Sequence, residues 1–272
     1  MVLEGEVLIP HIIHYCWFGN NPFSEKEIKC IESWKKFCPD YEIKLWNEDN
    51  FDLDCCDYVR EAYAAKKWAF VSDYARFWIL YNYGGVYFDT DVEIIKSIDQ
   101  IVERGAFMGT EPGGGIAPGL GIGAERGMNL YRDILDFYAT IHFLLPDGSL
   151  NEQTVVKYTT EVFKSRGWSF SSELKKVDGI WIYPSDVFCP IDNRTGKTHF
   201  TENTVSIHNY SASWHTKLDD IVYKIERCGE SSGFEYRFKR VLSFPFRVIN
   251  KYKKLGFKNT MNFIRMKLSN KM

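Results

Sequence analysis

The sequence predicts an α/β fold, and three consecutive segments near the start of the chain indicate it. Ile9–Phe18 is a short apolar run bounded by proline and glycine, which is typical of a buried strand. A helix follows, because Ser24 and Glu27 form a capping box and Pro39 closes an apolar repeat of helical spacing. Residues 41–45 then alternate between apolar and charged, as in a strand. A strand, a helix and a strand with short connections form a βαβ unit with parallel strands.

Two more predicted helices lead to the next strand. Residues 57–67 have a helical pattern, and residues 68–83 continue as a second helix. Gly84 and Gly85 end that helix, since glycine accepts the left-handed conformation of a helix cap. Val86–Phe88 is then predicted to be a buried strand that ends at Asp89-Thr90-Asp91.

Composition excludes several classes of protein. The 272 residues are 45% hydrophobic and 26% charged, with a net charge of −2, which excludes a disordered chain, a collagen-like chain and a general nucleic-acid binder. No apolar run approaches the roughly 20 residues that span a bilayer. Residues 1–8 carry glutamates where a signal peptide needs basic residues, so we expect a cytoplasmic protein. Seven cysteines without a CxxC pair suit reduced thiols.

The charge is unevenly distributed along the chain. Residues 237–272 hold eleven basic residues and no acidic one, interleaved with apolar side chains, whereas residues 1–236 are acidic overall. We therefore predict a main domain over 1–236 and a basic amphipathic helical extension over 237–272, divided by Pro245 and Gly256. Such a segment can lie on an anionic membrane surface. The alternative is a helical pair packed on the acidic body.

Asp89 and Asp91 are the first candidates for chemistry. Carboxylates two residues apart, directly after a buried strand, lie at the carboxyl edge of a parallel sheet, where α/β proteins bind ligands. Such a pair can hold Mg²⁺ or Mn²⁺ together with phosphate oxygens. The alternative is turn chemistry, in which aspartate accepts bonds from nearby backbone N–H groups.

Asp73 and Arg76 are the second candidates. They stand three residues apart and share one face of an otherwise apolar and aromatic helix. An ordinary helical ion pair is the alternative, but ionised groups are costly in apolar surroundings unless they are used. The position favours a functional pair.

Three ordered blocks resemble glycosyltransferase family 32, the DXD sugar transferases: Ile9–Gly19, Ala69–Arg76 and Tyr83–Asp91. The resemblance extends from about Ile9 to Trp214. The family includes bacterial capsular and O-antigen transferases and fungal mannosyltransferases, and its core is similar to that of the clostridial glucosylating toxins. The resemblance implies a GT-A fold, a nucleotide-sugar donor, Mn²⁺ or Mg²⁺, and retention of anomeric configuration.

The resemblance also implies roles for individual residues. Asp89 and Asp91 match the DXD carboxylates, which contact the donor through the metal ion. Asp89 is therefore also expected to be a donor-binding residue. Asp73 and Arg76 match the catalytic pair that holds donor-sugar hydroxyls and diphosphate. Trp17 matches the aromatic residue that stacks on the nucleobase, although core packing is an alternative for it.

The segment Ser206–His215 resembles the family's histidine-containing segment that ends in Ser-Trp and closes over the donor. His208 is the candidate third metal ligand, because a neutral imidazole can bind Mn²⁺. An ordinary loop histidine is the alternative, and His215 is the second choice. Trp214 is expected to pack on the bound nucleotide or sugar.

A nucleoside diphosphate leaves in this reaction, so a metal ion and Arg76 would lower the barrier by stabilising its negative charge. No general base can be assigned from the sequence. Glu111 and Asn151–Gln153 are candidates for the acceptor side. The glycine-rich stretch 113–123 looks flexible and does not fit GxGxxG, which indicates an acceptor-side or structural loop.

The predicted function is transfer of a hexose, with UDP-galactose as the first donor, to a glycan acceptor that is lipid-linked and serves surface polysaccharide synthesis. The predicted location is the inner face of the cell membrane. One alternative is a haloacid-dehalogenase-like phosphatase, which Glu93 disfavours because that motif has threonine or valine at this position. A non-catalytic sugar-binding protein is the other.

Overall fold

The computed structural model describes residues 9–193, 195–210 and 241–249, together with positions 221, 222, 225, 252, 260, 261 and 264. Trp214, His215 and residues 1–8 lie outside the described residues. Packing divides the chain into two units, Met1–Ile191 with Thr198–Ser211 and Asp192–Lys197 with Ala212–Met272. The domain boundary after residue 236 stays a prediction.

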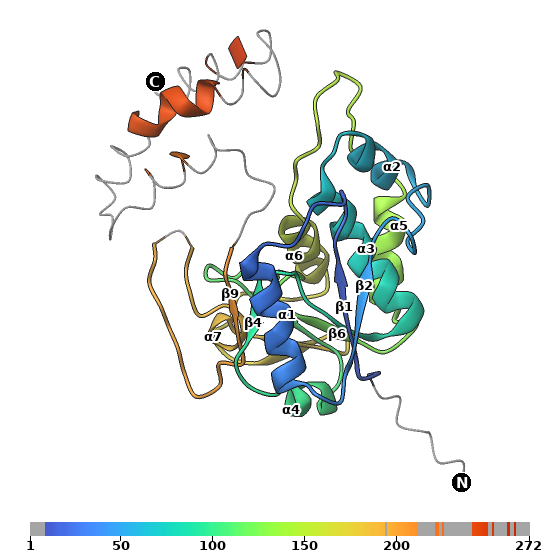
Figure 1. The fold of residues 1–272 in the computed structure, drawn as a ribbon, viewed down its shortest axis with the longest axis vertical. Coiled ribbons are helices and arrows are strands. Elements are labelled where there is room, and N and C mark those ends of the chain that lie inside the picture. Colours follow the sequence, from blue (N-terminus) through green and yellow to red (C-terminus); the bar gives the residue numbers. More distant parts are fainter. Residues whose placement is uncertain are drawn as a thin grey trace. The chain divides into compact units, whose positions relative to one another are not determined.

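A seven-stranded sheet with the order β2-β1-β3-β6-β5-β8-β7 forms the centre of the first unit (Figure 1). The strands are β1 Ile12–Cys16, β2 Glu42–Trp46, β3 Gly85–Tyr87, β5 Phe107–Gly109, β6 Ile122–Ala124, β7 Lys175–Val177 and β8 Ile180–Tyr183. β1 pairs in parallel with both β2 and β3, while β6 and β7 run antiparallel to their neighbours. The predicted α/β class and its first parallel βαβ unit are confirmed.

A second, two-stranded sheet lies outside the main one. β4 (Val92–Ile94) pairs antiparallel with β9 (Ser206–His208), and the register places Val92 opposite His208. This pairing joins two segments more than a hundred residues apart in the sequence. It brings the C-terminal end of the first unit back to the Asp89-Thr90-Asp91 turn.

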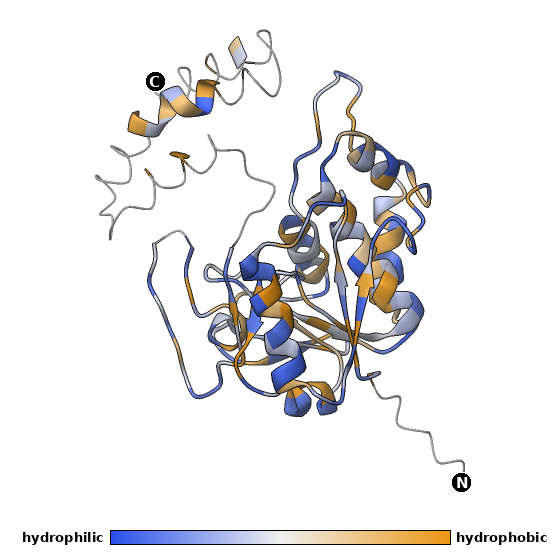
Figure 2. Ribbon diagram, in the orientation of Figure 1, coloured by the Kyte–Doolittle hydropathy of each residue, from blue (hydrophilic) through white to orange (hydrophobic). Residues whose placement is uncertain are grey.

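The three predicted helices are present as α1, α2 and α3, and α4 to α7 are helices that the sequence analysis did not predict. Their bounds are α1 Glu25–Phe37, α2 Asp57–Ala64, α3 Trp68–Tyr83, α4 Asp99–Glu103, α5 Asn129–Tyr138, α6 Val155–Ser165 and α7 Ser185–Phe188. The capping box of α1 is present, with the Ser24 amide donating to Glu27 Oε2 at 2.7 Å. α3 ends at Gly84, whose φ of 67° is unfavourable for residues with a side chain. Figure 2 shows hydrophobic and hydrophilic residues alternating along α1.

Two apolar clusters cover the two faces of the sheet. One holds Cys16, Tyr87 and Met108 with buried residues of α2, α3, α5 and α6. The other holds Ile13 and Phe88 with buried residues of α1, α4 and α7. Neighbouring strand residues fall into different clusters because successive side chains of a strand point to opposite faces. The first unit is therefore a three-layer arrangement of helices, sheet and helices.

His14 fixes the end of α3 to the first two strands. Its side chain is fully buried, its Nε2 lies 3.0 Å from the Gly84 carbonyl, and its Nδ1 accepts from Trp46 Nε1 at 3.1 Å. Burial lowers the pKa of His14 to about 4, so the ring is neutral and Nε2 is the donor. This contact holds the turn from which β3 starts toward Asp89.

Residues 241–249 form a continuous helix in the second unit. The prediction that Pro245 would divide this stretch is therefore wrong. Proline removes its own backbone donor and one helical hydrogen bond, while the adjacent bonds of the helix can remain. Within the described part of the chain, no helix is both long and apolar enough to cross a membrane.

Candidate metal and donor site

Asp89 lies two residues after the end of β3, and three groups contact it. Its backbone N–H donates to the Gly119 carbonyl at 3.0 Å. Its Oδ1 accepts from the Tyr87 hydroxyl at 3.0 Å and pairs with Arg76 Nη2 at 3.2 Å. Tyr87 is fully buried, so this hydroxyl sits where water cannot compete with it. The carboxylate is thus oriented before any ligand arrives.

Arg76 bridges two carboxylates that come from different parts of the fold. Its Nη2 lies 2.9 Å from Asp73 Oδ1 within α3, in addition to its contact with Asp89. The guanidinium is only 3% exposed and lies over the Tyr87 ring at 5.0 Å. An exposed helical ion pair contributes a few tenths of a kcal/mol, but this group is buried and shared. The predicted pair is brought together, and its catalytic role stays a prediction.

The charges of this group depend on one another. Burial raises the pKa of Asp73 to about 7, although Arg76 and the Val155 N–H both favour the ionised carboxylate. Burial also disfavours the charge on Arg76, but Asp89, Tyr87 and Asp73 together raise its pKa. Arg76 is therefore a permanent cation between the two carboxylates.

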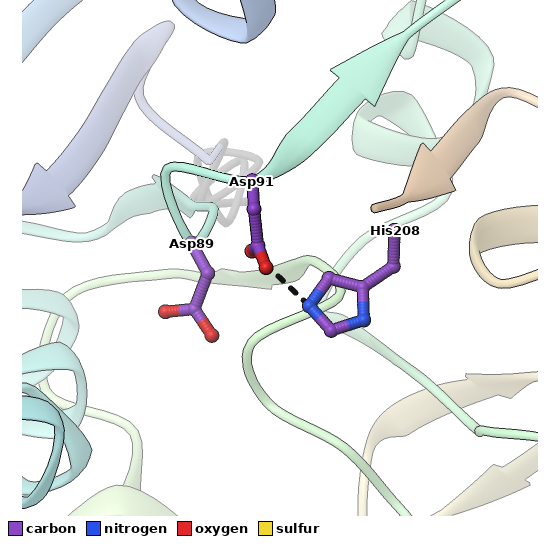
Figure 3. A group of neighbouring side chains, drawn as sticks. All are labelled: Asp89, Asp91 and His208. Carbon is purple, nitrogen blue, oxygen red and sulfur yellow. Dashed lines mark ion pairs between the residues drawn. The ribbon is translucent and has the colours of Figure 1, made fainter. Parts of the chain in front are cut away.

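His208 reaches Asp91 through the pairing of β4 with β9. The Asn209 N–H donates to the Asp91 carbonyl at 2.9 Å, and His208 Nε2 lies 3.1 Å from Asp91 Oδ1 (Figure 3). Burial opposes a charge on His208, yet the Asp91 carboxylate raises its pKa to about 10. The imidazole thus lies where positive charge is strongly favoured.

Asp89, Asp91 and His208 each offer one ligand atom, and these atoms lie within 4.8 Å of one another. The spacing and the chemistry of these three side chains therefore fit a divalent cation. Two carboxylates suit Mg²⁺ and Mn²⁺, and the added nitrogen favours Mn²⁺ over the oxygen-seeking Mg²⁺. A cation at this site would replace the proton between His208 Nε2 and Asp91 Oδ1. The predicted ligand set is brought together, while its binding of a metal stays a prediction.

The glycine-rich stretch contributes to the site in a way that the sequence did not indicate. A Cβ at Gly119 would lie 1.9 Å from Asp89 Oδ2, so only glycine lets this backbone approach the carboxylate. Residues 116–124 are buried throughout. The expectation of a flexible loop is wrong for this half of the stretch, because it packs against the end of β3.

Among the described residues, Trp17 is the remaining predicted donor residue. Trp17 follows β1, is half-buried, and packs against Phe23 with ring centroids 4.6 Å apart. Its Nε1 donates to the Asn21 carbonyl at 2.6 Å. Stacking of Trp17 on a nucleobase stays a prediction, as does the role of Trp214 outside the described residues.

Fold and site together define a class: an α/β protein with a carboxylate pair at the carboxyl end of a parallel strand, where such sheets bind their ligands. Residues 24–108 match the family model described as a glycosyltransferase sugar-binding region containing a DXD motif. The match confirms the resemblance found in the sequence over residues 24–108, which include Asp89 and Asp91. The predicted GT-A type of α/β fold agrees with this match.

Three curated relatives come from Schizosaccharomyces pombe. The chain is 26% identical to inositol phosphoceramide mannosyltransferase 3 over 66% of its own length and 51% of that protein. It is 30% identical to inositol phosphoceramide mannosyltransferase 1, over 38% of this chain and 35% of that protein. It is 31% identical to inositol phosphoceramide mannosyltransferase 2, over 37% of this chain and 30% of that protein. The chain thus matches about half of the first relative and about a third of the other two.

Two solved structures show partial similarity. The PaToxG glycosyltransferase is 21% identical with a TM-score of 0.43, covering 58% of this chain and 68% of that one. The galactosyltransferase LgtC, solved with donor and acceptor sugar analogues, is 13% identical with a TM-score of 0.32. The similarity covers 84% of this chain and 99% of that one.

Proposed function

We propose that this protein is a metal-dependent glycosyltransferase that moves a hexose from a nucleotide sugar to a glycan acceptor. The observation that carries the proposal is the convergence of Asp89, Asp91 and His208 within 4.8 Å, inside a chain that matches a DXD sugar-binding region. A phosphatase of the haloacid-dehalogenase type would need a free nucleophilic aspartate. The Asp89 carboxylate is instead bound by Arg76 and by the Tyr87 hydroxyl.

Each residue of the site would have a distinct role in such a transfer. Asp89, Asp91 and His208 would hold a divalent cation, which supplies positive charge for the departing diphosphate. Arg76 bridges Asp89 and Asp73, orients both carboxylates, and adds a permanent positive charge to the same region. Asp73 would accept hydrogen bonds from hydroxyls of the donor sugar. Preorganised charge of this kind lowers the barrier without a strong nucleophile, and the proposal includes retention of anomeric configuration.

The donor is proposed in two versions. UDP-galactose is the first donor to test, as the sequence resemblance implies. The alternative is a mannose donor such as GDP-mannose, which the names of the three relatives favour. Both donors present a diphosphate to the same carboxylates, so the metal site serves either.

The acceptor is proposed to be lipid-linked. The relatives are named for a sphingolipid acceptor, inositol phosphoceramide. Residues 237–272 carry eleven basic residues and no acidic ones, which fits a surface rich in anionic lipid. The proposed location is therefore cytoplasmic, on the inner face of the cell membrane, with surface polysaccharide as the product class.

The proposed activity is tested with nucleotide sugars and metal. Purified protein is incubated with UDP-galactose, UDP-glucose and GDP-mannose, with Mn²⁺, Mg²⁺ or chelator, and release of free nucleotide diphosphate is measured. We expect one donor to be cleaved slowly, with Mn²⁺ as the best metal. Hydrolysis of a simple phosphomonoester would instead indicate a phosphatase, and absence of cleavage with every donor would contradict a transferase.

The membrane proposal has its own test. A chain truncated before Arg237 is expected to lose salt-sensitive sedimentation with anionic vesicles, because the attraction is screened over about 8 Å at physiological salt. Donor cleavage should persist, since the candidate metal ligands lie upstream. Equal sedimentation of both chains would contradict the proposal and favour a tail packed on the protein.

A further inference from the structure

A cleft of about 670 Å³ lies between the turn that starts at Glu111 and one side of α6. We call it the α6 cleft. Its lining residues are Glu111, Gly113, Gly114, Gly115, Thr154, Val156, Lys157, Thr160, Glu161, Lys164, Trp168 and Phe170. Its volume falls within the roughly 300–1,000 Å³ that is usual for small-molecule sites. All of these residues belong to the first unit of the chain.

Both walls of the α6 cleft continue into the carboxylate site. On the helix side, Val155 lies between the lining residues Thr154 and Val156, and its N–H donates to the Asp73 carboxylate. On the loop side, the Ile116 N–H donates to Thr160 Oγ1 at 3.0 Å. Three residues later, Gly119 lies against Asp89. The cleft is therefore connected to Asp73 through Val155 and to Asp89 through the loop from Ile116 to Gly119, although neither carboxylate lines it.

The exposed aromatic ring of Phe170 lines the cleft and packs on the backbone beneath it. Phe170 is 64% exposed, which is unusual for so large an apolar side chain. Its ring packs on the backbone of Gly114, where a Cβ would lie 2.2 Å from Phe170 Cδ2 and where φ is +84°. Trp168 is buried and also lines the cleft. The electron-rich face of such a ring attracts the weakly positive C–H groups of a pyranose.

The charges that line the cleft balance. Glu111 and Glu161 stand against Lys157 and Lys164, and Lys164 pairs with Glu161 at 3.0 Å. Lys157 donates to Gln153 Oε1 at 3.0 Å. A site for a phosphate group would carry an excess of positive charge. This lining fits an uncharged polyhydroxyl compound instead.

We propose that the α6 cleft binds the terminal, uncharged sugar of the acceptor. A C–H face of that sugar lies on Phe170, and Glu111 accepts a hydrogen bond from one of its hydroxyls. This inference rests on the proposed transferase function, because it takes the sugar beside Asp73 to be the donor. It assigns the acceptor to a site that the donor and metal residues do not form.

The test measures binding of simple glycosides to the full-length protein. Methyl α- and β-glycosides of mannose, galactose and glucose are titrated in saturation-transfer NMR, in the presence of Mn²⁺ and UDP. Loss of the ring in Phe170→Ala is expected to weaken binding about tenfold, equivalent to about 1.4 kcal/mol. Glu111→Gln, which keeps the shape but removes the charge, is expected to weaken binding about fivefold. Because Phe170 is largely exposed, its variant should fold, and its melting temperature is measured alongside.

Matched controls are available outside the cleft. Phe200→Ala removes another exposed phenylalanine, and Glu173→Gln removes a carboxylate that is exposed and lies outside the cleft lining. Both controls should bind glycosides as the unchanged protein does. The proposal is overturned if no glycoside binds, or if Phe170→Ala and Glu111→Gln bind as the controls do.

A second probe and a second assay separate the remaining outcomes. Inositol phosphate is titrated against the unchanged protein and Lys157→Gln, and lysine-dependent binding of this anion in place of the glycosides would also overturn the proposal. Donor cleavage is measured on the unchanged protein. Glycoside binding that depends on Phe170, in a protein that cleaves no donor, would support the cleft as a sugar site while contradicting the transferase function.

Discussion

The carboxylate site and the α6 cleft are adjacent but hold their charges in different ways. In the carboxylate site, Arg76 is 3% exposed and is shared between Asp73 and Asp89, which come from α3 and from the end of β3. In the cleft, Lys164 and Glu161 are more than half exposed and pair along one helix. The first arrangement is fixed by burial, whereas the second is adjustable by rotation of surface side chains.

This difference matches the two kinds of ligand. A diphosphate carries concentrated negative charge, and fixed positive groups stabilise it without reorganisation during the reaction. An uncharged sugar needs a surface for its C–H face and a few hydrogen-bond acceptors. The comparison predicts that substitutions in the carboxylate site affect turnover strongly, while those in the cleft affect acceptor binding.

The largest effect is expected for Asp91→Asn. The substitution keeps the shape of the side chain but removes a charge from the candidate metal site, so cleavage of the nucleotide sugar should fall by at least about 100-fold. Asp89→Asn should be nearly as damaging. Cleavage is measured over a range of Mn²⁺ concentrations, with circular dichroism as the test of folding.

Asp186→Asn is the control for this prediction. Asp186 accepts from Thr201 Oγ1 at 2.8 Å and belongs to no candidate ligand group of the described residues, so its variant should cleave the donor normally. Unchanged Mn²⁺-dependent cleavage in Asp91→Asn would remove Asp91 from the metal site. An unfolded Asp91→Asn protein would instead show that the turn is structural.

A smaller effect is expected for Arg76→Lys. Lysine keeps the charge but lacks the planar group that reaches Asp73 and Asp89 together, so turnover should fall about 10- to 100-fold. Arg60→Lys is the matched comparison, because Arg60 also pairs with an aspartate three residues away but is 54% exposed. Its cleavage rate should not change. Equal rates in the two variants would reduce Arg76 to an ordinary helical ion-pair partner.

The smallest effect is expected for Tyr87→Phe. It removes one hydroxyl donor from Asp89 while Arg76 remains, and a hydrogen bond of about 1 kcal/mol corresponds to about fivefold weaker Mn²⁺ binding. Calorimetric titration with Mn²⁺ measures this change. Tyr131→Phe is the control, since that buried hydroxyl lies 3.5 Å from the Gly123 carbonyl, away from the carboxylates. Identical affinities in the two variants would show that Tyr87 serves packing alone.

The sequence by itself determined the local parts of this protein. The capping box of α1, the end of α3 at Gly84 and the strand before Asp89 follow from patterns that span a few residues. The contact between Asp73 and Arg76 follows from helical spacing for the same reason. Local propensity and side-chain periodicity act over one or two turns of chain, so they can be recognised without the fold.

Only the tertiary structure decided how distant segments meet at the site. His208 reaches Asp91 because β9 pairs with β4 in one particular register, and strand pairing at such separation depends on the whole sheet. The approach of Gly119 to Asp89 depends equally on how a buried loop closes on β3. The α6 cleft likewise combines Glu111 with Phe170, which share no local pattern. Contacts of this kind arise from packing and chain closure, which no short stretch of sequence encodes.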